Sequence, residues 1–192
     1  MKLPLSATIL LGFAPYIAFF IGMRAVSVDA GLDAALIVAI ANAGRDWLQT
    51  RSLKVLEVGN VVLFAALAGF TFAEHWTWSV MQVRLAVDAG LLAVVLASLA
   101  IGLPFTMQYA RERVPEPVWK TPFFRTVNTH VTWAWAAAFA VLVAMHATVV
   151  FVPGMPVWLD IAASPLVLLA AFRFSIWYPA QARKRAGVAL QS

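Results

Sequence analysis

The stretch from residue 123 to residue 151 reads FFRTVNTHVTWAWAAAFAVLVAMHATVVF, and it decides the class of fold. Arg125, near its start, is its only Asp, Glu, Lys or Arg residue. An α-helix of about 20 mostly apolar residues crosses the hydrocarbon core of a bilayer, which is about 30 Å thick. Residues 123–151 are therefore predicted to form a transmembrane helix.

The rest of the chain repeats this pattern. Of its 192 residues, 62% are hydrophobic and 12% are charged, whereas an ordinary soluble domain has about 45–50% apolar and about 25% charged residues. The first apolar stretch is long for the core of a cleaved signal peptide, so we expect it to remain as a span. The pattern predicts one all-α membrane domain over residues 1–192, a single bundle of about six transmembrane helices at 4–23, 31–47, 53–74, 83–103, 123–151 and 156–178.

The loops between these stretches differ in their content of lysine and arginine. Of the 14 such residues, the loops and termini on one side of the membrane hold eleven, and those on the other side hold two. Basic residues are enriched in cytoplasmic loops, so both termini are predicted to be cytoplasmic. This topology explains the net charge of +5, which therefore does not predict binding to nucleic acid. Tryptophans near the span ends predict contact with membrane lipids.

Few residues have the chemistry of a catalytic site. The chain has no cysteine, which excludes disulfides, thiolate metal ligands and cysteine nucleophiles. It also has no glycine-rich phosphate loop, no zinc-protease motif and no Gly-x-Ser-x-Gly turn. We therefore predict no catalytic residue, no metal site and no cofactor, and we do not expect an enzyme.

Polar side chains within the predicted spans are the best candidates for a functional site, because burying them in a membrane is costly. Glu57 and Asn60, three residues apart, share one helix face near the start of a span. Six residues are candidates for a polar vestibule on the cytoplasmic side, with Glu57 at its centre: Glu57, Asn60, Asn128, Arg45, Tyr109 and Arg111. The alternative is that these groups lie at helix ends beside the headgroups and only hold helices together.

Two pairs of residues lie near the opposite ends of the spans. Arg84 and Asp88 are four residues apart on one predicted helix, a spacing that favours a salt bridge between them. His75 and His146 lie at a similar predicted depth. Two such histidines can supply the axial ligands of a haem, so a haem-binding membrane protein is one alternative.

The longest loop, from residue 104 to residue 121, reads PFTMQYARERVPEPVWKT. Its first half is expected to continue the preceding helix into the cytoplasm, with Arg111, Glu112 and Arg113 exposed, until two prolines end it. Its aromatic and basic residues are typical of a segment that lies against anionic headgroups.

Three runs of sequence carry a resemblance to known proteins: SLKVLEVGNVVLF at 52–64, PFTMQYARERVPEPVW at 104–119 and FFRTVNTHVTWAWAAAF at 123–139. They resemble a family of small uncharacterised bacterial inner-membrane proteins, and the chain resembles the intracellular septation protein A family more distantly. The resemblance implies a multi-pass protein of the bacterial inner membrane, linked to the cell envelope and to envelope proteins as partners. It implies no catalytic residues.

The sequence leaves three functions open. We expect a non-enzymatic envelope protein that acts through the membrane or through partner proteins. One alternative is a small transporter or channel that uses the polar vestibule. The other is a haem protein that uses His75 and His146.

Overall fold

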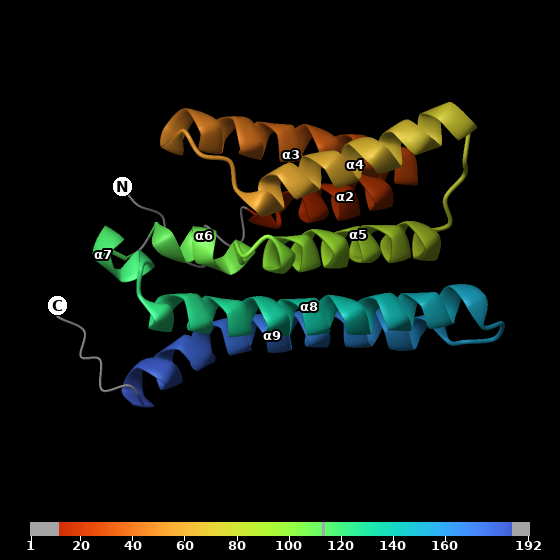
Figure 1. The fold of residues 1–192 in the computed structure, drawn as a ribbon. Coiled ribbons are helices and arrows are strands. Elements are labelled where there is room, and N and C mark those ends of the chain that lie inside the picture. The colour runs from red at the N-terminus through yellow and green to blue at the C-terminus, as the bar shows by residue number, and fades with distance from the viewer. Residues whose placement is uncertain (1–11, 113, 186–192) are drawn as a thin grey trace.

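The structure is a computed structural model that describes residues 12–112 and 114–185 (Figure 1). These residues are mostly helical and contain no β-strand. The helices are α2 (Ala14–Ala25), α3 (Val28–Thr50), α4 (Val55–Glu74), α5 (Val80–Ala100), α6 (Phe105–Arg111), α7 (Glu116–Trp119), α8 (Pro122–Phe151) and α9 (Val157–Arg185).

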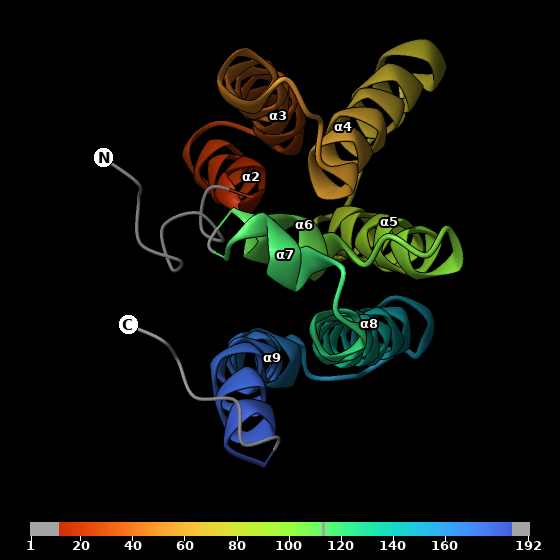
Figure 2. The ribbon, with the colours of Figure 1, turned by 60° about the vertical axis from the view of Figure 1, so that its left-hand side comes forward.

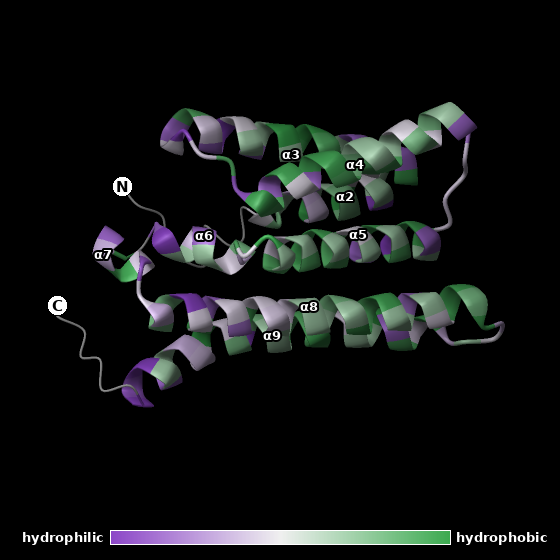
Figure 3. Cartoon of the chain, viewed as in Figure 1, coloured by the Kyte–Doolittle hydropathy of each residue, from purple (hydrophilic) through white to green (hydrophobic). Residues whose placement is uncertain are grey.

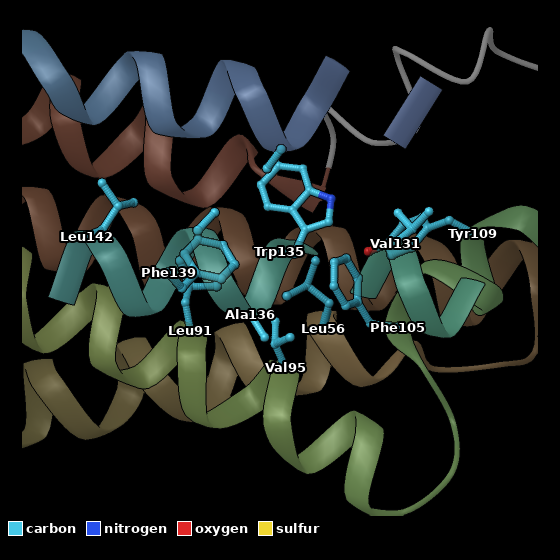
Figure 4. Packing of buried hydrophobic residues seen from close by; sticks show 12 residues of the cluster. Leu56, Leu91, Val95, Phe105, Tyr109, Val131, Trp135, Ala136, Phe139 and Leu142 are labelled. Atoms are coloured by element: carbon cyan, nitrogen blue, oxygen red, sulfur yellow. The ribbon is translucent and has the colours of Figure 1, made fainter. Parts of the chain in front are cut away.

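The long helices form two groups on either side of α5, as Figure 2 shows. Helices α2, α3 and α4 pack together on one side, and the α8–α9 hairpin packs on the other. A cluster of buried apolar side chains around Trp135 and Phe139 joins α5, α6, α8 and α9 (Figure 4). A second cluster around Phe19 and Phe64 joins α2, α3, α4 and α5. Helix α5 therefore contributes to both clusters and holds the two groups together.

Four helices, α4, α5, α8 and α9, are long and apolar enough to cross a membrane. This agrees with the predicted class, an all-α multi-pass membrane protein. Large apolar side chains face outward from the bundle, as contact with lipid requires: Phe72 is 84% exposed and Leu48 is 73% exposed. Figure 3 shows hydrophilic residues concentrated at the helix ends and on α6 and α7.

The two remaining predicted spans are less apolar or only partly described. Helix α3 has 23 residues, but Asp29 and Asp33 near its start and Arg45 and Asp46 near its end reduce its hydropathy. The predicted span 4–23 begins outside the described residues, and its described part lies in α2. The count of six spans and the cytoplasmic position of both termini therefore stay predictions.

The segment after α5 differs from the prediction that it continues this helix into the cytoplasm. The backbone turns at Gly102, whose φ of +72° favours glycine, and Leu103 N–H bonds to Ser98 C=O at 2.9 Å. Helix α6 then packs against α8 with Phe105 and Tyr109 buried. The expected solvated extension is wrong because the apolar face of α6 is buried in the bundle.

Glycines allow two pairs of helices to approach closely. A Cβ atom at Gly22 of α2 would lie 2.8 Å from the Cα of Gly31 in α3. A Cβ atom at Gly59 of α4 would lie 2.5 Å from the Val94 side chain of α5. Small residues at helix contacts are typical of membrane bundles, where close backbone packing replaces the hydrophobic effect.

Candidate functional site

Charged side chains are buried at both ends of the bundle. One set, which we call the Lys54 cluster, comprises Arg45, Asp46, Lys54, Glu57 and Glu112. It joins the end of α3, the start of α4 and the end of α6. The other set, the His146 cluster, comprises Arg84, Asp88, His146 and Asp160. It joins the first half of α5, the end of α8 and the start of α9.

Lys54 is the centre of the first cluster. Its Nζ atom forms an ion pair with Asp46, lies 2.8 Å from Glu112 Oε1 and lies 3.7 Å from Glu57 Oε1. The ammonium group also lies 4.7 Å from the centroid of the Tyr109 ring, which is a cation–π distance. One cation thus holds three carboxylates from three helices, so the cluster closes this end of the bundle.

The environment perturbs two groups outside the spans. Burial by itself would lower the pKa of Lys54, but the hydrogen bonds to Asp46 and Glu112 outweigh it and hold the pKa above its ordinary value. Burial, followed by the carboxylate charges of Glu57 and Asp46, raises the pKa of Tyr109 well above its ordinary value. At neutral pH, Lys54 is therefore charged and the Tyr109 hydroxyl keeps its proton.

The structure brings together only part of the predicted vestibule. Glu57 is buried, with 4% of its surface exposed, and it lies beside Lys54. Arg45 Nη2 lies 3.5 Å from Asp46 Oδ1, and Tyr109 contacts Lys54 through its ring. Arg45 and Glu57 therefore belong to the Lys54 cluster, and the Tyr109 ring packs against its central ammonium group.

The other three predicted residues do not share one site with Glu57. Asn128 donates to Phe124 C=O on its own helix at 2.7 Å, and Arg111 lies over the Trp119 ring at 5.8 Å. Asn60 donates to Gly12 C=O at 3.1 Å and accepts a bond from the Tyr16 hydroxyl. The structure therefore brings Arg45, Glu57 and Tyr109 together around Lys54, whereas the printed contacts of Asn60, Asn128 and Arg111 are with other groups. That the six residues form one vestibule stays a prediction.

His146 is the centre of the second cluster, and it is 1% exposed. Its Nδ1 atom lies 2.8 Å from Asp88 Oδ2, and its Nε2 atom lies 3.2 Å from Asp160 Oδ2. The same Asp160 oxygen accepts a hydrogen bond from Arg84 Nη1 at 3.1 Å. Both contacts of the imidazole are ion-pair contacts rather than aligned hydrogen bonds. The ring therefore lies between two carboxylates from two different helices.

The contacts of the His146 cluster bear on the predicted Arg84–Asp88 pair and on the predicted haem ligands. Arg84 and Asp88 were expected to pair with each other, but Arg84 binds Asp160 on α9 and Asp88 lies against His146 on α8. His75 ends α4 in an exposed position, and both nitrogens of His146 face carboxylates. This arrangement does not favour these two histidines as axial ligands of one haem.

Sequence reasoning missed Asp160 as a site residue. Its side chain is 1% exposed, and its Oδ1 atom has no hydrogen-bond partner in the described residues. The available signal was an acidic residue in the first turn of an apolar helix, with Ser164 four residues later. That signal is weak, because an acidic residue is common at helix starts for its interaction with the helix dipole.

The His146 cluster has one more negative than positive charge when His146 is neutral. Arg84 then supplies one positive charge against the carboxylates of Asp88 and Asp160. A neutral imidazole has only one N–H group, so its second nitrogen would present a lone pair to a carboxylate oxygen. A proton on both nitrogens removes this repulsion and makes the cluster neutral. An uncompensated buried charge is costly, and interacting groups of this kind take up and release protons as one unit.

A cavity of about 100 Å³ lies beside this cluster, between α2, α5, α8 and α9. Asp88 and His146 line one part of it and Tyr16 lines another. The Tyr16 hydroxyl donates to Asn60 Oδ1, and Asn60 lies one helical turn after Glu57. Polar groups therefore lie at two places on an otherwise apolar cavity wall, Asp88 and His146 at one and Tyr16 at the other.

A metal centre has no support among the described residues, where no group of three His, Asp or Glu side chains has the geometry to hold an ion. Compared with protein-family models, with curated proteins and with solved structures, the chain matches none of them. The two charged clusters and the cavity are therefore the features of the protein that bear on its function.

Proposed function

We propose that the protein is a small transporter that moves protons across the bacterial inner membrane, with the His146 cluster as its proton-binding site. One observation carries this proposal: a buried cluster that lacks one positive charge contains an imidazole with a carboxylate oxygen at each nitrogen. Ionisable groups buried within membrane helices are characteristic of proton relays and transport pathways.

The position of the cluster supports this role. It lies at the end of the bundle where the α8–α9 loop is located, whereas the Lys54 cluster lies at the end with α6 (Figure 1). The distribution of basic residues favours a cytoplasmic position for the Lys54 end. The Tyr16–Asn60 hydrogen bond and the cavity lie between the two clusters. A proton taken up at His146 would therefore have polar groups along the interior of the bundle.

Proton flux into proteoliposomes tests the proposal. Purified protein is reconstituted in vesicles that contain a pH-sensitive dye, and a pH gradient is imposed. Wild-type protein is expected to dissipate the gradient faster than empty vesicles, and Asp88→Asn is expected to reduce the rate to that of empty vesicles. The matched control is Asp33→Asn, because Asp33 is an exposed carboxylate on α3. Equal rates for wild-type protein and empty vesicles, or for Asp88→Asn and wild-type protein, would contradict the proposal.

The orientation has a separate test. The chain has no native cysteine, so single cysteines report the side of the membrane without background. In intact cells, an impermeant thiol reagent is expected to label Met155→Cys, next to the α8–α9 loop, and not Glu116→Cys on α7. Both positions are exposed. Labelling of Glu116→Cys together with protection of Met155→Cys would show that the protein has the opposite orientation in the membrane.

The role in binding envelope partners, which the family resemblance implies, stays a second proposal. The exposed apolar faces of the helices fit partner proteins as well as lipid. Co-purification of the tagged protein in mild detergent, followed by identification of bound proteins, tests that role.

A further inference from the structure

We infer that a second pocket, between the end of α8 and the start of α9, binds a small neutral aromatic molecule that carries one N–H or O–H donor, such as an indole or a phenol. This inference goes beyond the proposed function and does not depend on it. It is supported by the apolar wall of the pocket, by a buried carboxylate oxygen without a partner, by the charge balance of that carboxylate and by the volume of the pocket.

This α8–α9 pocket has a mostly apolar wall. Apolar side chains from both helices and from the loop between them line it, among them Met145, Met155, Leu159 and Ala163. Thr148 and Asp160 contribute the polar side chains. Small-molecule sites have this composition, an apolar wall with a few polar groups that orient the ligand. Because Met155 and Leu159 are exposed, the pocket is open to a ligand from outside the bundle.

Both polar side chains of the pocket offer hydrogen-bond acceptors. The Asp160 side chain is 1% exposed, and its Oδ2 atom is the one that contacts Arg84 and His146. Its Oδ1 atom has no hydrogen-bond partner in the described residues, and an unpaired buried polar atom is costly. The Thr148 hydroxyl donates to Ala144 C=O at 2.7 Å, so its oxygen can only accept from a ligand. The pocket therefore fits a ligand that donates a hydrogen bond.

The charge balance of Asp160 favours a neutral donor. The Arg84 guanidinium already lies 3.1 Å from Asp160 Oδ2, so the carboxylate has a cationic partner. A cationic ligand would have to leave water for an apolar pocket, which is far more costly for an ion than for a neutral N–H or O–H group. An anionic ligand would be repelled by the carboxylate. A neutral donor avoids both costs and still forms a hydrogen bond to a charged acceptor, which is stronger than one between neutral groups.

Two thioether side chains favour an aromatic ligand. Met145 from α8 and Met155 from the loop before α9 both line the pocket. Methionine sulfur makes favourable contacts with aromatic rings, and the flexible side chain adapts to the shape of a ligand. A planar ring with a donor at its edge can therefore contact these side chains and bond to Asp160 Oδ1 at the same time.

The volume of the pocket limits the size of the ligand. An apolar cavity of about 150 Å³ holds one benzene molecule, which has six carbon atoms. The α8–α9 pocket has a volume of about 260 Å³ and therefore holds roughly ten heavy atoms by the same proportion. Indole and phenol fall within this limit, whereas 2-phenylindole exceeds it.

Methyl NMR of methionine provides the direct test. The chain has six methionines, so ¹³C-methyl labelling of the purified full chain gives few signals, and the variants Met145→Leu and Met155→Leu assign the two from the pocket. Titration with indole is expected to shift both of these signals to saturation, because the bound ring lies beside the two methyl groups. The signal of Met107, which is buried on α6, is expected to stay unchanged.

Matched ligands test the hydrogen bond while Asp160 stays in place, since replacing Asp160 is itself expected to destabilise the protein. Benzofuran has the ring framework of indole with an oxygen atom instead of the N–H group. It is expected to need a concentration about tenfold higher or more for the half-maximal shift, because a hydrogen bond to a charged group is lost. Benzylammonium and 2-phenylindole are expected to leave both pocket signals unchanged.

A matched pair of variants tests the location. Ala163→Leu adds volume to a residue of the pocket wall, and it is expected to weaken indole binding about tenfold or more. Ala162→Leu makes the same change at the neighbouring exposed position of α9, outside the pocket wall. This control is expected to bind indole as the wild-type protein does.

Four results would overturn the inference. They are pocket signals that indole leaves unchanged up to its solubility limit, equal shifts of all methionine signals, which indicate partition into lipid or detergent, equal half-maximal concentrations for indole and benzofuran, and equal binding of indole by Ala163→Leu and the wild-type protein. Proton flux is a separate measurement, so loss of the proposed function would leave this site standing, and loss of the site would leave the proposed function standing.

Discussion

The Lys54 and His146 clusters have similar components but different access to water. Each has carboxylates around a basic centre, and each joins three helices. In the Lys54 cluster, the side chains of Arg45 and Glu112 are 36% and 33% exposed. In the His146 cluster, no side chain is more than 15% exposed. Solvent screens an unbalanced charge in the first cluster, whereas the second has little solvent contact to screen its charge.

The comparison also shows two ways of assembling an ionic site. Most of the Lys54 cluster comes from residues 45–57, which belong to the turn between α3 and α4 and to its flanking helices. The His146 cluster joins residues 84, 88, 146 and 160, which meet only when α5, α8 and α9 pack together. The first cluster therefore stabilises a local turn, and the second depends on the tertiary packing of the bundle.

The largest expected effect is the loss of one carboxylate from the drier cluster. Asp160→Ala leaves Arg84 without its carboxylate partner in a site that excludes water, so we expect a loss of stability of about 3–5 kcal/mol. Thermal unfolding of the purified protein in detergent measures this loss. The control is Asp33→Ala on the exposed face of α3, where a change within about 0.5 kcal/mol is expected. Equal destabilisation by the two variants would contradict the explanation that Asp160 stabilises the protein by pairing with the buried Arg84.

The second-largest effect is expected from the loss of Lys54, the centre of the more solvent-exposed cluster. Lys54→Met leaves Asp46 and Glu57 close together without their cation, and we expect a loss of about 2–3 kcal/mol. The loss is smaller than for Asp160→Ala because Arg45 stays 3.5 Å from Asp46 and the cluster reaches solvent at Arg45 and Glu112. Adding Asp46→Asn to Lys54→Met is expected to restore part of the stability, because the remaining carboxylates then repel less. A double variant less stable than Lys54→Met would contradict this explanation.

The Lys54 variant has a predictable pH dependence. The pKa of Lys54 is raised in the folded protein, so its stabilising contribution is fully present below the ordinary lysine value of about 10.4. It is lost as the pH rises through the raised value. The difference in unfolding temperature between wild-type protein and Lys54→Met is expected to stay constant from neutral pH to that limit and to shrink above it.

The smallest effect is expected at the solvated edge of the same cluster. Glu112 is one-third exposed, so Glu112→Gln should cost only about 0–1 kcal/mol, and added salt should reduce the difference further. Unfolding temperatures at low and high ionic strength measure both quantities. A loss as large as that of Asp160→Ala, insensitive to salt, would mean that the two clusters are equally dry.

The class of fold could be predicted from the sequence because hydropathy over about 20 residues reports directly on a membrane helix. Residues 123–151 show this most clearly, and α8 covers Pro122–Phe151. Helix α3 shows the limit of that signal, since charged residues at its ends lower its hydropathy although it is 23 residues long. The loop after α5 was predicted less well, because the burial of α6 depends on contacts with α8 that no local pattern contains.

The candidate site was predicted only where its contacts are local. Lys54 and Glu57 are three residues apart, and their proximity follows from helix geometry. The same rule wrongly paired Arg84 with Asp88, because spacing shows that two residues share a helix face but not which helix packs against that face. The partners of Asp160, Arg84 and His146, lie far from it in the sequence, so no local spacing indicated them. They meet only when α9 packs beside α5 and α8.

The contact between Gly22 and Gly31 limits how the cavity can open. At this point the backbones of α2 and α3 approach too closely for a methyl group, so the two helices cannot slide or separate without losing the contact. Helix α2 supplies one wall of the cavity, and α5, α8 and α9 supply the others. Any opening of the cavity at α2 would therefore move the α2–α3 hairpin as one unit rather than bend α2 alone.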